Sequence, residues 1–316
     1  MGFTISDTTY AGKNLEGFIT RAMIGNEPFQ KGIMYIEENV DKKFTIPRLV
    51  LTDLVQAVAA TPVSQGTATV DGRTLTPGGY MLYWEFNPKK FDDHWFSAML
   101  EGSLLDRTLP ATLESAIVQE FLKYHDDWLA SALFSSDNSG TDLLGGTDYV
   151  YFDGWVRKML DDSDVNDVSS PVTLTSANIE AKFQACEDLL ITSAPALLYD
   201  PDTKFIVSYK TAKLWERAQA SATYKGIDNT RAGLLAFQGR EIVPIKGCPD
   251  NTIILTRTGA ARTSNLWAGV QAISDSMEIK LMPLQNNSDK WFIKMINEID
   301  VNHGFGADVV LYTTLT

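Results

Sequence analysis

A chain of 316 residues with 44% hydrophobic and 21% charged residues can bury a sizeable core, and its length predicts about two domains. The net charge of −13 excludes a protein that grips nucleic-acid phosphates through a basic stripe, although not one that encloses DNA. Two cysteines exclude a disulfide framework and indicate a reducing compartment, and no apolar run is long enough to span a membrane.

The first predicted elements are a peripheral segment and a strand. Residues 1–40 read as an arm with a short helix around Ala11–Met23. The stretch KFTIPRLVL (43–51) predicts a strand, and Pro47 restricts it to a sheet edge or a bulge because proline cannot donate a ladder hydrogen bond.

Residues 66–86, GTATVDGRTLTPGGYMLYWEF, predict a hairpin followed by an aromatic strand. Asp71-Gly72 is typical of a tight two-residue turn, which needs positive φ. In 80–86, alternate residues Tyr80, Leu82 and Trp84 share one face. We therefore expect strand 43–51 to run out, a tip at 66–79 to follow, and strand 80–86 to return as a ribbon whose apolar side chains need a cover.

The longest predicted helix covers residues 110–134. Thr108 can cap it, and Pro110 stands in its first turn, where a missing N–H is tolerated. Apolar residues recur at helical spacing and predict a broad buried face. That face is Leu113, Ile117, Phe121, Tyr124, Trp128 and Ala132, widened by Val118, Leu122, Leu129 and Leu133.

The remaining chain predicts mixed helices and strands. Helix 176–191 carries Cys186 on its apolar face, where a thiol packs as a small hydrophobe. Strand 204–208, helix 209–222 and strands within 234–257 follow, and three strands with polar turns close the chain. The fold class is α+β, without internal repeats.

The histidines offer little chemistry. His94 and His125 each stand beside two aspartates, which permits a metal or acid–base interpretation. Neighbouring residues on a helix or strand point in different directions, however, so solvated charges are the favoured interpretation. His303 has no evident partner in the sequence.

The acidic run 160–167 is the best metal candidate. Counted from Asp162, it begins like a calcium-binding loop, but Asp167 stands where the turn glycine belongs and Thr173 where a bidentate glutamate is needed. A solvated loop is therefore favoured. Arg257 and Arg262 could meet a carboxylate or phosphate, and an exposed turn is again favoured. No catalytic motif occurs, so we expect no enzyme, no cofactor, and no catalytic or metal residues.

The order of these parts resembles the major capsid proteins of tailed double-stranded DNA bacteriophages, the Johnson-fold phage capsid family. Four stretches are individually similar to that family, and their order strengthens the resemblance. They are 148–159, 176–219, 235–255 and 289–314. The resemblance implies an N-terminal arm (1–40), an extended β-ribbon loop (41–90), a peripheral domain (91–139 and 279–316) with spine helix 110–134, and an axial domain (140–278).

The resemblance implies a structural shell subunit of the virion. Such a subunit self-assembles into hexamers and pentamers of an icosahedral capsid enclosing double-stranded DNA, without sequence-specific DNA binding or membrane contact. Its assembly would take place in the host bacterial cytoplasm. Implied partners are a portal, possible decoration proteins and a scaffold, which we expect as a separate protein because the chain starts almost directly in the arm.

Two departures bear on how neighbours are held. Some family members crosslink a loop lysine to an asparagine in the closing strands, but no lysine lies between Phe44 and Pro88, and Met295 occupies the asparagine's position. We therefore expect no autocatalytic crosslinks and contacts made by packing and charge, with apolar burial outweighing ion pairs. The expected intersubunit contacts of the extended loop are Arg48, Asp71, Arg73, Tyr80, Leu82, Tyr83, Trp84 and Glu85.

Two alternatives stay open. An encapsulin-like compartment shell shares the fold but encloses protein cargo. A carboxylate- or metal-dependent enzyme would use Asp92, Asp93 and His94, or the acidic loop at 161–167.

Overall fold

In the part of the chain that the structure describes, the strands form two six-stranded sheets and a separate two-stranded ribbon, and helices pack on the sheets. This computed structural model describes residues 8–10, 27–58, 60–61, 63–87, 111–221, 235–271, 279–284 and 290–316. The expected helix at Ala11–Met23, the capping residues Thr108 and Pro110, and His94 with its aspartates lie outside these ranges.

The first sheet is organised around one long strand, β13. Antiparallel strand β5 runs along one edge of β13, and β12 and β11 lie one after the other along its other edge. Strand β1 extends the sheet beyond β12, and β2 pairs with β11 in parallel. The bounds are β1 Thr8–Tyr10, β2 Tyr35–Glu37, β5 Gly78–Phe86, β11 Leu266–Val270, β12 Ile279–Pro283 and β13 Trp291–His303.

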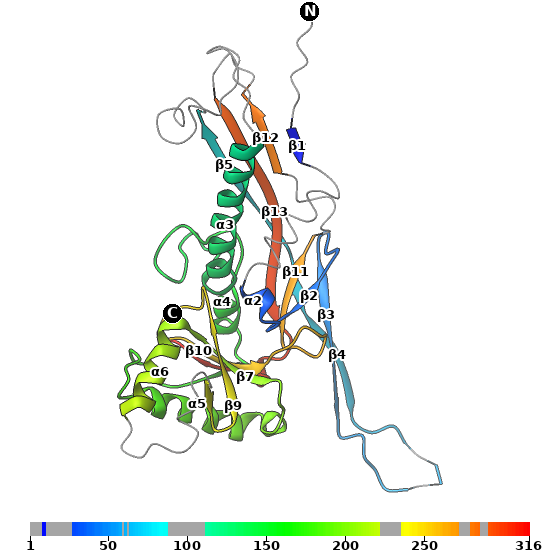
Figure 1. The fold of residues 1–316 in the computed structure, drawn as a ribbon. Coiled ribbons are helices and arrows are strands. Elements are labelled where there is room, and N and C mark those ends of the chain that lie inside the picture. Colours follow the sequence, from blue (N-terminus) through cyan, green and yellow to red (C-terminus); the bar gives the residue numbers. More distant parts are fainter. Residues whose placement is uncertain are drawn as a thin grey trace, which may run out of the picture.

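Helix α3 (Ala111–Ser135) confirms the predicted long helix and runs beside β5 and β13 (Figure 1). Its apolar face packs on the first sheet, with Leu129 and Leu133 fully buried. Two expectations about this face were wrong. Tyr124 is exposed, and His125, expected to be solvated, is buried instead. The buried centre of the face follows the widening residues Val118, Leu122, Leu129 and Leu133, and His125 lies in line with them and contacts Tyr80 of β5.

The second sheet forms the other lobe of the molecule. Its strand order is β6-β14-β10-β7-β9-β8, and helices α5 (Ile179–Ser193) and α6 (Tyr209–Ser221) pack on it through an aromatic core around Phe183. Cys186 is buried in that core, as predicted. The strands are β6 Asn166–Asp167, β7 Thr203–Ser208, β8 Ala236–Phe237, β9 Arg240–Ile245, β10 Ile253–Arg257 and β14 Val310–Tyr312.

Sheet membership departs from the predicted segment boundaries. The last strand, β14, pairs with β10 and β6 in the second sheet, whereas we expected all closing strands in the peripheral region. Strand β11 lies in the first sheet, although its sequence falls inside the expected axial segment. Short connecting elements complete the fold: α2 Glu27–Gln30, α4 Trp155–Leu160, and single 3-10 turns at Pro195–Leu197 and Gly306–Asp308.

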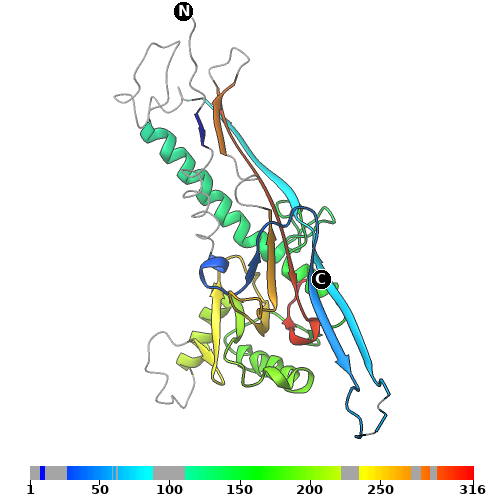
Figure 2. The same cartoon turned by 90° about the vertical axis from the view of Figure 1, so that its right-hand side faces the viewer.

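The ribbon consists of β3 (Phe44–Thr52) and β4 (Thr67–Leu75), paired antiparallel along their full length. Figures 1 and 2 show both strands projecting away from the two sheets. The predicted path of the chain was therefore wrong in one respect. The strand that returns from the tip is β4, the tip is residues 53–66, and strand 78–86 belongs to the first sheet.

Asp71-Gly72 is not a turn but the middle of β4. Gly72 lies opposite Pro47 in the register, and a Cβ at position 72 would approach the Thr45 Cγ2 atom to 2.6 Å. Glycine is required here for close approach of two backbones, not for positive φ. The dipeptide alone cannot distinguish these two uses of glycine.

Candidate assembly surface

The ribbon (residues 44–75) exposes more apolar surface than a two-stranded element can bury. Leu49 and Val70 face each other across β3 and β4 with 59% and 77% of their area exposed. In the tip, Val55 and Val58 are almost completely exposed. Fully burying a side chain of this size stabilises by about 1.5–3 kcal/mol, so this surface gains substantially from a partner. The other exposed large apolar side chains of the ribbon are Val50, Leu51, Leu54 and Val63.

The base of the ribbon is held to the first sheet by an apolar cluster. Ile46 and Leu75 are buried against Trp267 of β11. Phe44 stacks on the same indole, and Tyr35 of β2 meets its edge with ring centroids 4.7 Å apart. The ribbon is therefore packed where it leaves the sheet and unsupported further out.

One face of the ribbon continues from this cluster into a row of charges. Side chains alternate along a strand, so Leu75, Arg73 and Asp71 share a face of β4. Arg48 lies directly opposite Asp71, and its Nε donates to Asp71 Oδ1 at 2.6 Å. The hydrogen bond with Asp71 raises the pKa of Arg48, and the same bond lowers the pKa of Asp71. Arg48 and Asp71 thus pair within the chain.

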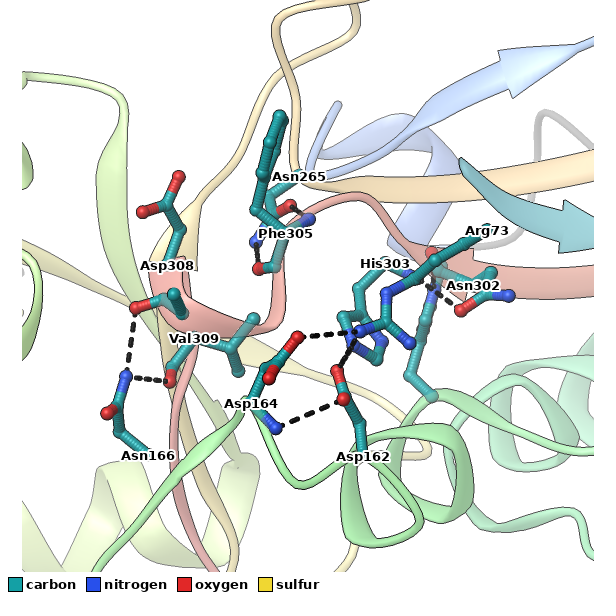
Figure 3. Close-up of polar contacts among 12 residues, drawn as sticks. Arg73, Asp162, Asp164, Asn166, Asn265, Asn302, His303, Phe305, Asp308 and Val309 are labelled. Atoms are coloured by element: carbon teal, nitrogen blue, oxygen red, sulfur yellow. Dashed lines mark hydrogen bonds and ion pairs between the residues drawn. The ribbon is translucent and has the colours of Figure 1, made fainter. Parts of the chain in front are cut away.

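Arg73 reaches from the ribbon to the segment after α4 (Figure 3). Its guanidinium forms an ion pair with Asp162, whose carboxylate also accepts a hydrogen bond from His303 Nε2 at 2.7 Å. Burial opposes ionisation of Asp162, but the hydrogen bonds from His303 and Arg73 hold its pKa below the ordinary value. Burial lowers the pKa of His303, which favours the neutral imidazole. The acidic run thus supplies a partner for the ribbon.

Asp164 lies between the two arginines. Its carboxylate is 3.8 Å from Arg73 and 4.0 Å from Arg48. The Arg48 guanidinium also lies over the Phe305 ring, 5.7 Å from its centroid. We call the two sheets, their helices and the segments that connect them the body. Both arginines of the ribbon therefore face Asp164 of the body, and Arg48 also faces the ring of Phe305.

Three segments that connect the lobe of the first sheet to the lobe of the second meet beside this cluster (Figure 3). They are residues 160–166, 257–266 and 303–310. Asn265 binds the third segment, accepting from Phe305 N at 2.7 Å and donating to its carbonyl oxygen at 2.9 Å. Asn166 donates to the carbonyl oxygens of Ala307 and Val309. The ribbon charges therefore meet the body at the junction of its two lobes.

The predicted contact residues of β5 have different surroundings. Tyr80 is buried within its own chain, so it is not part of an exposed surface, and Leu82 is half-buried. Tyr83 and Trp84 are about half exposed. Glu85 accepts a hydrogen bond from the Tyr83 hydroxyl at 2.7 Å and lies 3.4 Å from Lys290.

The remaining candidates for chemistry have structural partners. Arg257 pairs with Asp200, and Arg262 lies 3.2 Å from Glu37, so both arginines meet carboxylates as well as solvent. Over the described ranges, no three His, Cys, Asp or Glu side chains gather to hold a metal ion, and no helix there is long and apolar enough to cross a membrane.

Sequence reasoning missed the most connected residues of this surface. Asp162 was noticed only as part of an acidic run, and His303 only as a histidine without a partner. Their contacts join positions 89 and 141 residues apart, which no local pattern encodes. The available signal was Arg73, the single cation of strand β4 (TATVDGRTL).

Similarity to known proteins is found in the three-dimensional structure and not in the sequence. No family model and no curated protein matches the sequence. The structure is similar to a chain of the satellite phage P4 procapsid, with a TM-score of 0.65 and 12% identity over 97% of this chain and 92% of that one. It is also similar to the capsid of an empty GTA particle (TM-score 0.55, 14% identity, 92% and 90% covered). The capsid of Myoviridae phage XM1 gives a TM-score of 0.53 at 10% identity, with 90% and 91% covered.

These matches span nearly the whole of this chain and of the chains it resembles. The chain therefore has the α+β Johnson fold of tailed-phage major capsid proteins, as its resemblance to that family predicted.

Proposed function

We propose that this chain is a major capsid protein, a shell subunit that assembles into the hexamers and pentamers of an icosahedral virion capsid. Each subunit contributes many weak contacts, and a closed shell multiplies them through effective concentration. The shell would enclose double-stranded DNA without reading its sequence, in keeping with the net charge of −13.

The observation that carries this proposal is the exposed apolar surface of the ribbon. Leu49, Val55, Val58 and Val70 have no cover within the part of the chain that the structure describes. A ribbon of two strands is marginal in water and needs a third surface. A neighbouring subunit supplies that surface in a shell, and the fold shared with capsid subunits makes a copy of the same chain the natural partner.

A substitution series in the tip tests the proposal. Val55→Ser with Val58→Ser removes the most exposed apolar groups, whereas Val55→Ile with Val58→Ile keeps them apolar. We expect the isoleucine variant to form shells or tubes in electron micrographs and the serine variant to remain as capsomers or monomers, with equal thermal stability of the unassembled subunits. Equal assembly by both variants would exclude a contact through the tip. Small oligomers alone from the wild-type chain, under every condition, would exclude the shell function.

The content of purified particles separates the two shell functions. Packaged nuclease-resistant DNA supports a virion capsid, and a protein cargo supports an encapsulin-like compartment. A portal, a separate scaffold and decoration proteins belong to the capsid proposal, with assembly in the host cytoplasm. We also propose that the shell lacks covalent crosslinks, because no lysine lies between Phe44 and Pro88 and Met295 is buried opposite Leu82. Boiled particles should then run as single subunits in denaturing gels.

A further inference from the structure

The ion pair between Arg73 and Asp162 connects two parts of the molecule that could otherwise move separately. Arg73 belongs to the ribbon, and Asp162 belongs to a segment that connects the two lobes of the body. The outer part of the ribbon projects away from both sheets (Figures 1 and 2), and its innermost ion pair with the body is the one made by Arg73. A contact at this point therefore sets the direction in which the ribbon leaves the body.

The Asp162 carboxylate is also held by two donors that belong to the body. His303 donates to its carboxylate at 2.7 Å, and the backbone N–H of Asp164 donates to the other oxygen at 3.1 Å. The chain at Gly306 packs so closely that a Cβ there would lie 2.9 Å from Asp164 Cβ. The carboxylate thus has a single position, which makes it a defined anchor for a guanidinium.

Burial distinguishes this pair from the other ion pair of the ribbon. The Asp162 side chain is 8% exposed, whereas Asp71, paired with Arg48, is 40% exposed. Solvent screens the second pair more strongly, and its two residues both belong to the ribbon. Of these two pairs, only Arg73–Asp162 is both shielded and placed between ribbon and body.

We propose that Arg73, Asp162 and His303 form a latch that fixes the direction of the ribbon, and that Asp162 is the positioning residue through which the ribbon is presented to a neighbouring subunit. The apolar cluster at Trp267 holds the base of the ribbon as a pivot, and the latch restricts rotation about it. A ribbon held in one direction loses less conformational entropy on docking, which speeds assembly. The assembly role rests on the proposed shell function, whereas the latch does not.

The latch is tested on the unassembled subunit by a distance measurement. Spin labels are placed through Thr69→Cys on β4 and Glu180→Cys on α5, both exposed positions. The two native cysteines are buried, and burial raises the pKa of Cys186 to about 12 and that of Cys248 further, so they resist labelling. We expect one narrow distance distribution for the otherwise unchanged chain.

Asp162→Asn removes the charge of the anchor, and Asp71→Asn is its matched control within the ribbon. We expect the narrow distribution to be lost in the first variant and kept in the second. Arg73→Gln removes the pair from the ribbon side and leaves Asp162–His303 in place, so it should also lose the narrow distribution even if Asp162→Asn fails to fold. A narrow distribution in Arg73→Gln, or equal broadening in Asp71→Asn, would overturn the latch.

Assembly kinetics followed by light scattering test the second half of the proposal. Asp162→Asn should assemble more slowly than Asp71→Asn at equal concentration, and equal rates would overturn the positioning role. If the wild-type chain forms no shells, the proposed function fails, and the distance measurement still decides whether the latch exists.

Discussion

The hydroxyl of Tyr80 on β5 lies 2.7 Å from Nε2 of His125 on α3, in the buried contact between the long helix and the first sheet. Asn297 of β13 joins them, with its amide nitrogen 3.2 Å from the Tyr80 oxygen. Burial lowers the pKa of His125 to about 4 and raises the pKa of the Tyr80 hydroxyl above its ordinary value. Both groups are therefore neutral near pH 7, and a proton on His125 would be a buried charge.

His125 should make the subunit sensitive to acid. Its pKa is about 4 in the folded state and 6.5 in the unfolded state, so the stability it contributes is full above pH 6.5 and is lost as pH falls toward 4. We expect His125→Gln to reduce the loss in unfolding free energy between pH 7 and pH 4.5 by about 2 kcal/mol. Urea unfolding of the unassembled subunit measures this, and an unchanged pH dependence would contradict it.

Asp300 should lower the stability of the subunit as pH rises, whereas His125 lowers it as pH falls. Asp300 is buried at the junction of β4 and β5, where it accepts a hydrogen bond from Thr76 N at 2.6 Å, and burial raises its pKa to about 6. Lys158 lowers that pKa and Asp153 raises it, so both also face the group electrostatically. Stability from a raised carboxyl pKa is present below about pH 4 and is lost as pH rises through 6.

Replacing the Asp300 carboxylate with a neutral amide should therefore remove a cost in folding stability that the wild type has at neutral pH. Asparagine keeps an acceptor oxygen for the Thr76 N–H but loses the one that accepts from the Val301 N–H, at any pH. Because asparagine does not ionise, we expect the stability of Asp300→Asn relative to the wild type to rise between pH 4 and pH 7. The comparison uses urea midpoints at both pH values. If the urea midpoint of Asp300→Asn falls further below that of the wild type as pH rises, the ionised carboxylate is needed at this junction.

Gly72 should be essential for pairing of the ribbon strands. Gly72→Val places a branched side chain against Thr45 and the Ile46 carbonyl oxygen. We expect amide exchange in β3 to accelerate by about tenfold, equivalent to ~1.4 kcal/mol, while unfolding of the body changes little. Ala68→Val lies on the same face of β4 and serves as the control, with exchange close to the wild-type rate. Equal protection in both variants would contradict the close approach at Gly72.

The buried ion pair between Glu187 and Arg240 should dominate the stability of the second lobe. Both side chains are 7% exposed, with Arg240 Nε 2.9 Å from Glu187 Oε1. Glu187→Ala leaves a buried guanidinium without its carboxylate, which costs about 3–5 kcal/mol. Glu216→Ala breaks the exposed pair with Lys213 and should cost at most about 1 kcal/mol. Chemical denaturation of both variants decides whether burial makes this difference.

Local pattern predicted the regular elements well. Helical spacing placed the long helix at 110–134, within one residue of Ala111–Ser135 at each end. Strand alternation located 80–86 inside β5. These features depend on residues a few positions apart, whose side chains share a face of one helix or strand. The order of the elements was enough to indicate the family fold.

The partners of charged and polar groups required the tertiary structure. Asp71-Gly72 looked like a turn because turn propensity is local, whereas the opposing strand with Pro47 decided its true conformation. The sequence favoured a solvated His125, but the structure buries it in the core against Tyr80, which lies 45 residues earlier in the chain.

The sequence by itself determined the long helix, the strands around 44–51 and 80–86, and the α+β order of the main elements. Only the tertiary structure decided that the tip of the ribbon is 53–66 and that Arg73 is held by Asp162. The physical reason is distance along the chain. Periodicity is set by neighbouring residues, whereas a contact across 89 positions exists only after both sheets have formed and brought its partners together.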